Sequence, residues 1–300
     1  MILQVLILYS LFGFSFTIGK MILFYASPFF IVALRMLIGG ACLLTYIYAK
    51  HRIRCYPQKS DMWLYIQNAV FGTYLFYSLR AWSLQYITTT KAALLFNLFP
   101  FFTAIISYFH LKERFSIQKV FGLSLGFLGM IPLLINNSSY EDLIGGVSFL
   151  SWPELLMIAA VASLSYSTVV MQKLVKHRQC PPVLANGVSM LIGGAMALTS
   201  AMLVEPIWIR GDCKMLALLA FVQIVISNLI CSNLQAHLLR HYSTTFLSLA
   251  SFLSPLSAVI YGWLFFHETV TWHFFASFAT VFIGLVLYHF DELRKKIHAN

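Results

Sequence analysis

Two stripes of polar side chains interrupt otherwise apolar stretches of the chain and offer hydrogen-bonding chemistry. Thr73, Tyr77 and Arg80 stand at positions i, i+4 and i+7, which places them on one face of a helix. A shift of 155 residues carries these positions onto Asn228, Ser232 and Gln235. Such hydroxyl, amide and guanidinium groups could line a path for a polar small molecule. Hydrogen bonding between helices would gather on the same faces, so packing is the alternative.

Arg35 is a cation inside an apolar run. It lies eight residues after Ser27, so roughly 12 Å deep at 1.5 Å per helical residue. An unpaired cation is costly at that depth and needs a partner. A substrate carboxylate or phosphate would suit the planar guanidinium. Helix carbonyls, or snorkelling to the membrane surface, would satisfy the charge as well, so a structural role remains the alternative.

Five further residues are candidates for conformational or asymmetric roles. Asn97 is a candidate cavity residue, and its position in the shifted copy holds a phenylalanine, an asymmetry that a non-symmetric substrate would require. Pro100 and Pro255 each remove a backbone hydrogen bond and are candidate hinges, with ordinary packing as the alternative. Glu113 and Glu268 fall at helix ends and are interpreted as gate or capping residues.

Patterns of catalytic and metal-binding residues are absent from the sequence. It contains no H-E-x-x-H, no G-x-S-x-G and no phosphate loop, and its five cysteines lack C-x-x-C spacing. No carboxylate is expected near the middle of a membrane, which disfavours proton-coupled export of lipophilic cations. We therefore predict no catalytic residue, no metal and no cofactor. A membrane-embedded enzyme is the alternative of a different class, and a channel is disfavoured because filter motifs are missing.

The elements that must position these residues are transmembrane helices. The chain is 60% hydrophobic and 10% charged, whereas soluble domains are roughly 25% charged. Apolar runs of about 20 residues in a bilayer require helices rather than barrel strands. The predicted fold class is an all-α membrane protein with ten transmembrane helices, and its partner is the lipid bilayer. The predicted spans are 2–24, 28–49, 62–84, 91–111, 117–136, 153–175, 183–204, 214–237, 244–266 and 273–290.

The basic residues favour one orientation of these helices and argue against nucleic acid as a partner. The net charge of +10 is distributed in short clusters between apolar runs, without the single basic patch of a nucleic-acid-binding protein. Fourteen Lys and Arg residues fall on one side of the ten spans and five on the other. Since cytoplasmic loops carry the excess of Lys and Arg, both termini are predicted to be cytoplasmic.

The two halves of the chain form an internal repeat. The 155-residue shift superposes Pro100 on Pro255 and Glu113 on Glu268. We expect a first repeat over 1–136, an exterior linker over 137–152, a second repeat over 153–290 and a basic cytoplasmic tail over 291–300. Because each repeat contains five helices, the second enters the membrane from the opposite side, and the repeats are inverted.

The motifs of both halves resemble the EamA-type members of the drug/metabolite transporter superfamily. They are Phe14-Ser15-Phe16 through Lys20, Pro28 and Arg35, then Pro100, Leu111-Lys112-Glu113 and the glycines 122, 126 and 129, and in the second half Pro255, His267-Glu268 and Gly284. The second half departs from the pattern, with Ser277 and Val281 in place of two of the glycines. The resemblance implies ten helices around a central cavity lined mainly by helices 1, 3, 4, 6, 8 and 9.

The resemblance and the polar residues together predict a secondary transporter that moves a small organic metabolite by alternating access. A basic, carboxylate-free and aromatic-rich cavity suits a molecule with an anionic end and a planar or cationic part. S-adenosylmethionine, exchanged for S-adenosylhomocysteine as in some members of the superfamily, fits this description, and so does an amino acid. A nucleotide-sugar or drug exporter of the same superfamily is the alternative. The expected location is a bacterial inner membrane.

Overall fold

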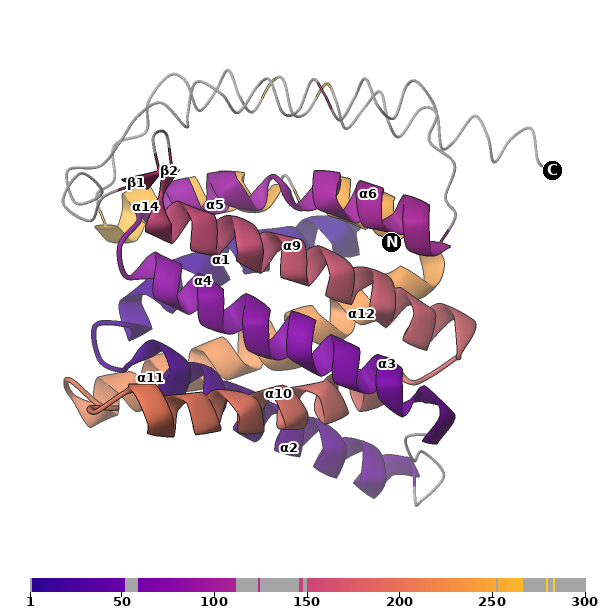
Figure 1. Ribbon diagram of the computed structural model, residues 1–300, viewed down its shortest axis with the longest axis horizontal. Coiled ribbons are helices and arrows are strands. Elements are labelled where there is room, and N and C mark those ends of the chain that lie inside the picture. Colours follow the sequence, from indigo (N-terminus) through magenta and orange to yellow (C-terminus); the bar gives the residue numbers. More distant parts are fainter. Residues whose placement is uncertain are drawn as a thin grey trace.

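The long apolar runs of the sequence form helices that lie alongside one another (Figure 1). The structure is a computed structural model, and it describes residues 2–51, 59–111, 146–147, 150–251 and 253–266 with the single positions 124, 279 and 283. The predicted spans 117–136 and 273–290 lie almost wholly outside the described residues. Five described helical stretches are long and apolar enough to cross a membrane: Leu3–Ile22, Pro28–Ala49, Trp152–His177, Pro182–Val204 and Cys213–His241.

The first half of the chain contains four runs of helix. The first two are uninterrupted, and the other two are divided into shorter segments. In chain order the elements are α1 (Ile2–Ile22), α2 (Pro28–His51), η1 (Lys59–Asp61), α3 (Met62–Gln67), η2 (Asn68–Leu75), α4 (Phe76–Leu84), α5 (Thr89–Phe96) and α6 (Phe99–Leu111).

The second half repeats this order of continuous and divided helices, after a short two-stranded ladder. The ladder pairs β1 with β2 in antiparallel register and lies in the predicted exterior linker, where no strand was expected. The elements are β1 (Gly146–Val147), β2 (Leu150–Ser151), α9 (Trp152–Gln172), η3 (Lys173–His177), α10 (Pro182–Val204), α11 (Cys213–Gln223), η4 (Ile224–Cys231), α12 (Ser232–His241), α13 (Thr244–Ala250) and α14 (Leu253–Phe266).

Local sequence explains where several helices begin. Ser151 and Glu154 form a capping box at the start of α9, with the backbone N–H of Ser151 donating to Glu154 at 2.6 Å. Asp212 accepts from the backbone N–H of Lys214 at 2.9 Å and starts α11. At the start of α2 the carboxylate comes from the far end of α10, because Glu205 accepts from the backbone N–H groups of Phe29 and Phe30.

The divided helices are irregular at matching places in the two halves. Both η2 and η4 are π-helical turns of eight residues, beginning at Asn68 and Ile224. The α5–α6 run breaks at 97–98, and the α13–α14 run breaks at Ser251, directly after α13. Wide turns and breaks leave backbone groups that other side chains must satisfy, so such places often serve function.

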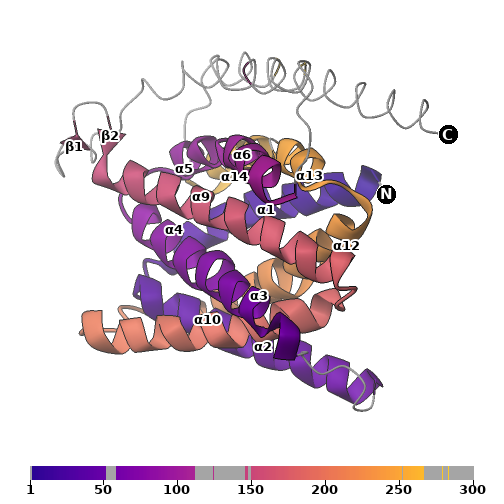
Figure 2. The same ribbon diagram turned by 45° about the vertical axis from the view of Figure 1, so that its right-hand side comes forward.

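The continuous helices α2 and α10 pack tightly against each other, and Figures 1 and 2 show them side by side at one edge of the molecule. A Cβ atom on Gly40 would lie 3.0 Å from Leu191 Cγ, and one on Gly194 would lie 3.1 Å from Leu37 Cγ. Later residues of α2 therefore contact earlier residues of α10, so the two helices run antiparallel. Glycine at these positions allows the close approach, because any larger residue would require the facing helix to shift.

Helix α1 contacts helices from both halves of the chain. It packs against α5, α11, η4, α13 and α14. Leu8 and Tyr9 are fully buried, and the Tyr9 hydroxyl donates to the carbonyl of Leu247 in α13. At the end of α1, the backbone N–H of Ser27 donates to the carbonyl of Trp208 at 2.9 Å and links the loop before α2 to the loop after α10. This packing fixes the helices that border the cavities.

Candidate functional site

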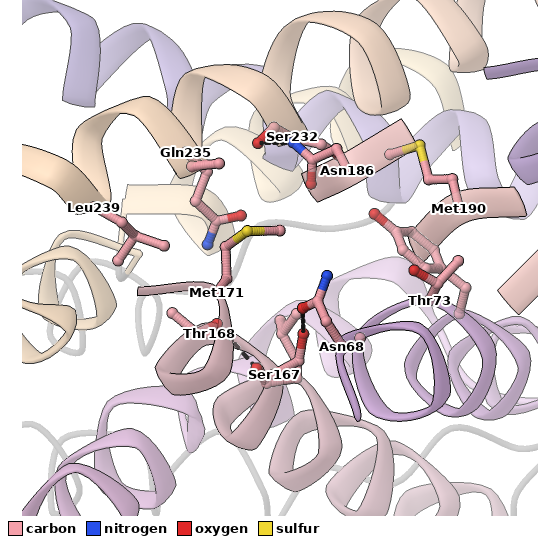
Figure 3. A pocket seen from close by; sticks show the side chains of 14 residues that line it. Asn68, Thr73, Ser167, Thr168, Met171, Asn186, Met190, Ser232, Gln235 and Leu239 are labelled. Atoms are coloured by element: carbon pink, nitrogen blue, oxygen red, sulfur yellow. Dashed lines mark hydrogen bonds between the residues drawn. The ribbon is translucent and has the colours of Figure 1, made fainter. Parts of the chain in front are cut away.

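Three adjoining cavities lie among the helices. The first, which we name the amide cavity, measures about 470 Å³ and is bordered by η2, α4, α9, α10 and α12 (Figure 3). Its lining combines polar and apolar side chains and includes no charged side chain among the described residues. The residues are Asn68, Gly72, Thr73, Tyr77, Leu164, Ser167, Thr168, Met171, Asn186, Met190, Ser232, Gln235, Ala236 and Leu239.

The second and third cavities continue from the first. The aromatic cavity, of about 430 Å³, is lined by Tyr9, Phe12, Phe16, Phe76, Tyr77, Arg80, Phe96, Phe99, Leu164, Ser227 and Gln235. The arginine cavity, of about 280 Å³, is lined by Gly19, Ile22, Leu23, Ile31, Val32, Arg35, Tyr77, Arg80, Ala81 and Leu84. Tyr77 borders all three cavities, so they lie next to one another, and we refer to the three together as the cavity system.

Arg35 projects from α2 and is only 4% exposed. Its Nη2 donates to Asn228 Oδ1 at 3.2 Å, and its Cζ lies 5.4 Å from the centroid of the Tyr77 ring. Its Nε has no hydrogen-bond partner in the described part of the chain. The nearest groups are therefore neutral, and the charge is only partly satisfied.

Arg80 projects from α4 and is in a similar position, with 5% of its surface exposed. Its Nη2 donates to the carbonyl of Ser15 at 3.1 Å, and its Cζ lies 4.1 Å from the ring centroid of Phe16. Its Nε also lacks a partner, and neither arginine forms a salt bridge with any described carboxylate. Two buried guanidinium groups without a counter-ion favour binding of an anion in the arginine cavity.

The carboxylates of the described chain are instead engaged at helix ends. Glu154 pairs with Lys91 at 2.6 Å, and both side chains are 5% exposed. Glu205 accepts from the hydroxyl of Ser27 as well as from the start of α2. Among the described residues no group of three His, Cys, Asp or Glu side chains could hold a metal ion.

The structure brings six of the eight predicted substrate residues to the cavities. Thr73, Tyr77, Arg80, Ser232, Gln235 and Arg35 each line at least one of them. Asn228 is fully buried behind the lining and holds Arg35. Asn97 lies at the break between α5 and α6, is 4% exposed and borders none of the three cavities.

The predicted conformational residues divide between described and undescribed parts of the chain. Pro100 is the second residue of α6 and Pro255 the third of α14, so each follows a helix break directly. In the first turn of a helix a proline removes no helical hydrogen bond, and the break itself accommodates its ring. Glu113 and Glu268 lie outside the described residues.

Sequence reasoning missed several polar residues of the amide cavity. Asn68 accepts from Ser167 at 2.6 Å and donates to Ser189 at 2.9 Å. It stands five residues before Thr73, a spacing that leaves an α-helical face but stays on the face of a π-helical turn. The signal that could have found the facing residues is the pair Ser163 and Ser167, one helical turn apart in α9.

A bundle of apolar helices around a polar internal cavity has the architecture of a membrane transporter. The comparison with known families agrees. The sequence profile of the EamA-like transporter family matches residues 1–135 and 151–290, and the chain belongs to that family. This confirms the resemblance seen in the sequence, and the protein is a transporter of the drug/metabolite superfamily.

Individual relatives cover almost the whole chain. The S-adenosylmethionine/S-adenosylhomocysteine transporter of Chlamydia muridarum is 31% identical over 287 residues, which is 94% of this chain and 89% of the relative. The protein of the same name from Chlamydia trachomatis serovar L2 is 32% identical over 94% of this chain and 86% of its own. A WAT1-related chloroplastic protein of Arabidopsis thaliana is 25% identical over 91% of this chain.

A solved crystal structure has the same fold. It superposes with a TM-score of 0.73 over 97% of this chain and 96% of its own, at 18% sequence identity. The helical architecture therefore extends beyond proteins of closely similar sequence.

Proposed function

We propose that this transporter carries S-adenosylmethionine across a bacterial inner membrane and exchanges it for S-adenosylhomocysteine. The observation that carries the proposal is the arginine cavity, where Arg35 and Arg80 are buried without a carboxylate partner among the described residues. The relatives that bear this name, at 31–32% identity over 94% of the chain, support the same cargo. The cargo crosses chemically unchanged, so no catalysis is part of the proposal.

The arginine cavity suits the amino-acid end of this substrate. A carboxylate can accept two parallel hydrogen bonds from one guanidinium group and is attracted by the second. Arg35 is already held by Asn228 and the Tyr77 ring, so its position is fixed before the substrate arrives. Fixing the guanidinium in advance lowers the entropic cost of binding. Thr73, Ser232 and Gln235 would bind the remainder of the molecule.

Transport would proceed by alternating access between two inverted repeats, over 1–136 and 153–290. Two sets of contacts support this symmetry. Gly40 meets Leu191 as Gly194 meets Leu37, and Gly39 meets Asn228 as Gly193 meets Thr73. The two contacts of each pair are related by the repeat. Adding 154 to Gly40 gives Gly194, and subtracting 154 from Leu191 gives Leu37. The second pair is related in the same way by 154 and 155 residues.

Reciprocal contacts of this kind are the signature of a two-fold axis. The antiparallel packing of α2 and α10 supports an axis that would relate helices crossing the membrane in opposite directions. The match of one family profile to both halves supports the duplication, and ten helices would complete it. Two such halves can exchange conformations, so that a central site faces each side in turn.

The breaks beside Pro100 and Pro255 are the natural hinges for this exchange. They occupy matching places in the two halves, and the first break adjoins the aromatic cavity through Phe96 and Phe99. Glu113 and Glu268, which the sequence predicts at helix ends, would act as gate residues. Chain breaks concentrate rotation at a few residues, as a hinge requires.

The proposal is tested by counterflow in proteoliposomes that contain the purified protein. Vesicles are loaded with S-adenosylhomocysteine, with methionine or with buffer, and uptake of radiolabelled S-adenosylmethionine is followed. We expect saturable uptake that internal S-adenosylhomocysteine accelerates and that empty liposomes lack. Uptake of labelled amino acids without any uptake of S-adenosylmethionine would overturn the cargo and leave the transporter class intact.

A further inference from the structure

The three cavities follow one another along a single run of helix. Moving from η2 into α4, Asn68 and Thr73 border the amide cavity, Phe76 the aromatic cavity, and Leu84 the arginine cavity. The cavity system extends from Asn68 to Arg80, roughly 18 Å at 1.5 Å per residue. An elongated cargo must therefore lie in one of two directions along it, and the chemistry of the walls decides between them.

The aromatic cavity lies between the other two. It shares Gln235 with the amide cavity and Arg80 with the arginine cavity. Ring faces attract cations that have been stripped of water, and sulfonium ions belong to this class. In the proposed cargo the sulfur atom also lies between two ends, a carboxylate-bearing chain and an adenosine. The order of the three cavities thus matches the order of the chemical groups in the cargo.

Gln235 differs from the other amides of the amide cavity in having no internal partner. Asn68 is bonded through both amide atoms to Ser167 and Ser189, and the Asn186 nitrogen donates to the carbonyl of Ser232 at 3.0 Å. Gln235 forms no hydrogen bond with any described residue, and it is half-buried. Figure 3 shows its amide directed into the space beside Met171.

The side-chain amide of Gln235 is suited to recognising the edge of an adenine ring by hydrogen bonds. Its oxygen accepts from the 6-amino group while its nitrogen donates to a ring nitrogen, a pairing that proteins use for adenine in nucleic acids. Met171 and Met190 supply polarisable apolar surface against which a flat ring can pack. The position in the first repeat that corresponds to Gln235 is Arg80. The first repeat therefore offers a cation at this position, and the second repeat offers a neutral hydrogen-bond donor and acceptor.

We propose that the cargo binds with its carboxylate in the arginine cavity, its sulfur in the aromatic cavity and its adenine in the amide cavity, where Gln235 reads the 6-amino group. This orientation rests on the proposed function. It makes Gln235 a specificity-determining residue for the base, separate from the residues that hold the amino-acid end.

The test combines a change in the ligand with a change in the residue. Counterflow of labelled S-adenosylmethionine is inhibited with S-adenosylhomocysteine and with its 6-desamino analogue, in which purine replaces adenine. For the wild type we expect the adenine compound to inhibit about tenfold more strongly, the worth of one good hydrogen bond. For Gln235→Met, inhibition by both compounds should weaken, because the amide nitrogen no longer donates to a ring nitrogen, but inhibition by the adenine compound should weaken more, until the two compounds are equal.

Thr168→Val is the matched control, because Thr168 lines the same cavity but its hydroxyl already donates to the carbonyl of Leu164 at 2.9 Å. It should retain the wild-type preference. If a variant fails to transport, the preference for the adenine compound over its analogue is measured instead by thermal unfolding, as the difference in how strongly each compound stabilises the purified protein.

A preference that persists in Gln235→Met, or that is absent in the wild type, would overturn the orientation while S-adenosylmethionine exchange itself remains. Wild-type protein that exchanges neither compound would overturn the proposed function, and the orientation with it.

Discussion

Two buried arginines carry an energetic cost for the fold. Arg35 and Arg80 are 4% and 5% exposed, and each keeps an Nε atom without a partner in the described chain. A charge in an apolar interior is destabilising unless opposite charge or several hydrogen bonds surround it. Residues that serve the fold alone would be paired with one of the available carboxylates, yet Glu154 and Glu205 are engaged elsewhere. The energetic cost is consistent with a role in binding.

Replacing Arg35 by glutamine separates a role in binding the substrate from a role in stabilising the fold. We expect the ligand-free protein to unfold at an unchanged or slightly higher temperature, because an uncompensated charge is removed. The affinity for S-adenosylmethionine should fall roughly 10- to 150-fold, the worth of a hydrogen bond to a charged group. Thermal unfolding with and without ligand, together with counterflow, measures both effects.

Arg178→Gln is the matched control, since this arginine is 57% exposed and pairs with Asp61 away from the cavities. It should leave transport unchanged, as exposed ion pairs contribute little. A marked loss of stability in Arg35→Gln, with ligand affinity retained, would assign Arg35 to the fold instead.

The sequence was most informative about residues on regular helix faces. The spacing of Thr73, Tyr77 and Arg80 predicted one stripe, and all three line the cavity system. Asn68 was missed because the π-helical turn brings it onto that face out of register with a 3.6-residue period. Asn97 stays a prediction: it lies in the break between α5 and α6 and borders none of the three cavities.

At the scale of elements, close approach between helices determines which backbones can move. Gly39 and Gly193 occupy equivalent places and face equivalent residues, Asn228 and Thr73. The two contacts differ in tightness. A Cβ atom on Gly193 would lie 2.6 Å from Thr73 Cβ and 2.9 Å from the carbonyl oxygen of Ala69, whereas one on Gly39 would lie 3.1 Å from Asn228 Cβ.

We therefore expect Gly193→Ala to destabilise the protein more than Gly39→Ala. The collision at Gly193 includes backbone, which cannot rotate away, and overpacking typically costs about 1–3 kcal/mol. Since Thr73 borders the amide cavity, Gly193→Ala should also weaken binding of the cargo. Thermal midpoints of the two purified variants provide the comparison. Equal midpoints, or a lower one for Gly39→Ala, would show that the α10–η2 contact can relax.

The helices themselves were predictable to within a few residues, while their irregularities were not. The expected span 62–84 corresponds to α3 through α4, and the expected span 214–237 to α11 through α12. Hydropathy reports which residues avoid water and carries no signal for a wide turn or for a break such as that at 97–98. Those features depend on contacts between helices from opposite halves of the chain, which local patterns do not contain.

The whole molecule is asymmetric from one end to the other. The ion pair between Lys91 and Glu154, and the contacts of Glu205 with the start of α2, lie at the end that the charge distribution predicts to be exterior. The amide cavity lies toward the opposite end, near the last turns of α9 and the first turns of α10. In the predicted orientation the amide cavity is nearer the cytoplasm, while the arginine cavity, lined by Ile22, Ile31 and Leu84, is nearer the exterior.

That orientation can be tested with the native cysteines. Cys213 is exposed at the start of α11, in the loop predicted to be exterior, whereas Cys180 and Cys231 are buried and Cys42 lies within the apolar span of α2. A membrane-impermeant maleimide applied to spheroplasts should therefore label the protein at Cys213, and Cys213→Ala should abolish the labelling. Lysis should add a second reactive position at Cys55, which belongs to a predicted cytoplasmic loop outside the described residues. Labelling of Cys213 only after lysis would mean that the excess of basic residues faces outward, and the amide cavity would then lie nearer the exterior.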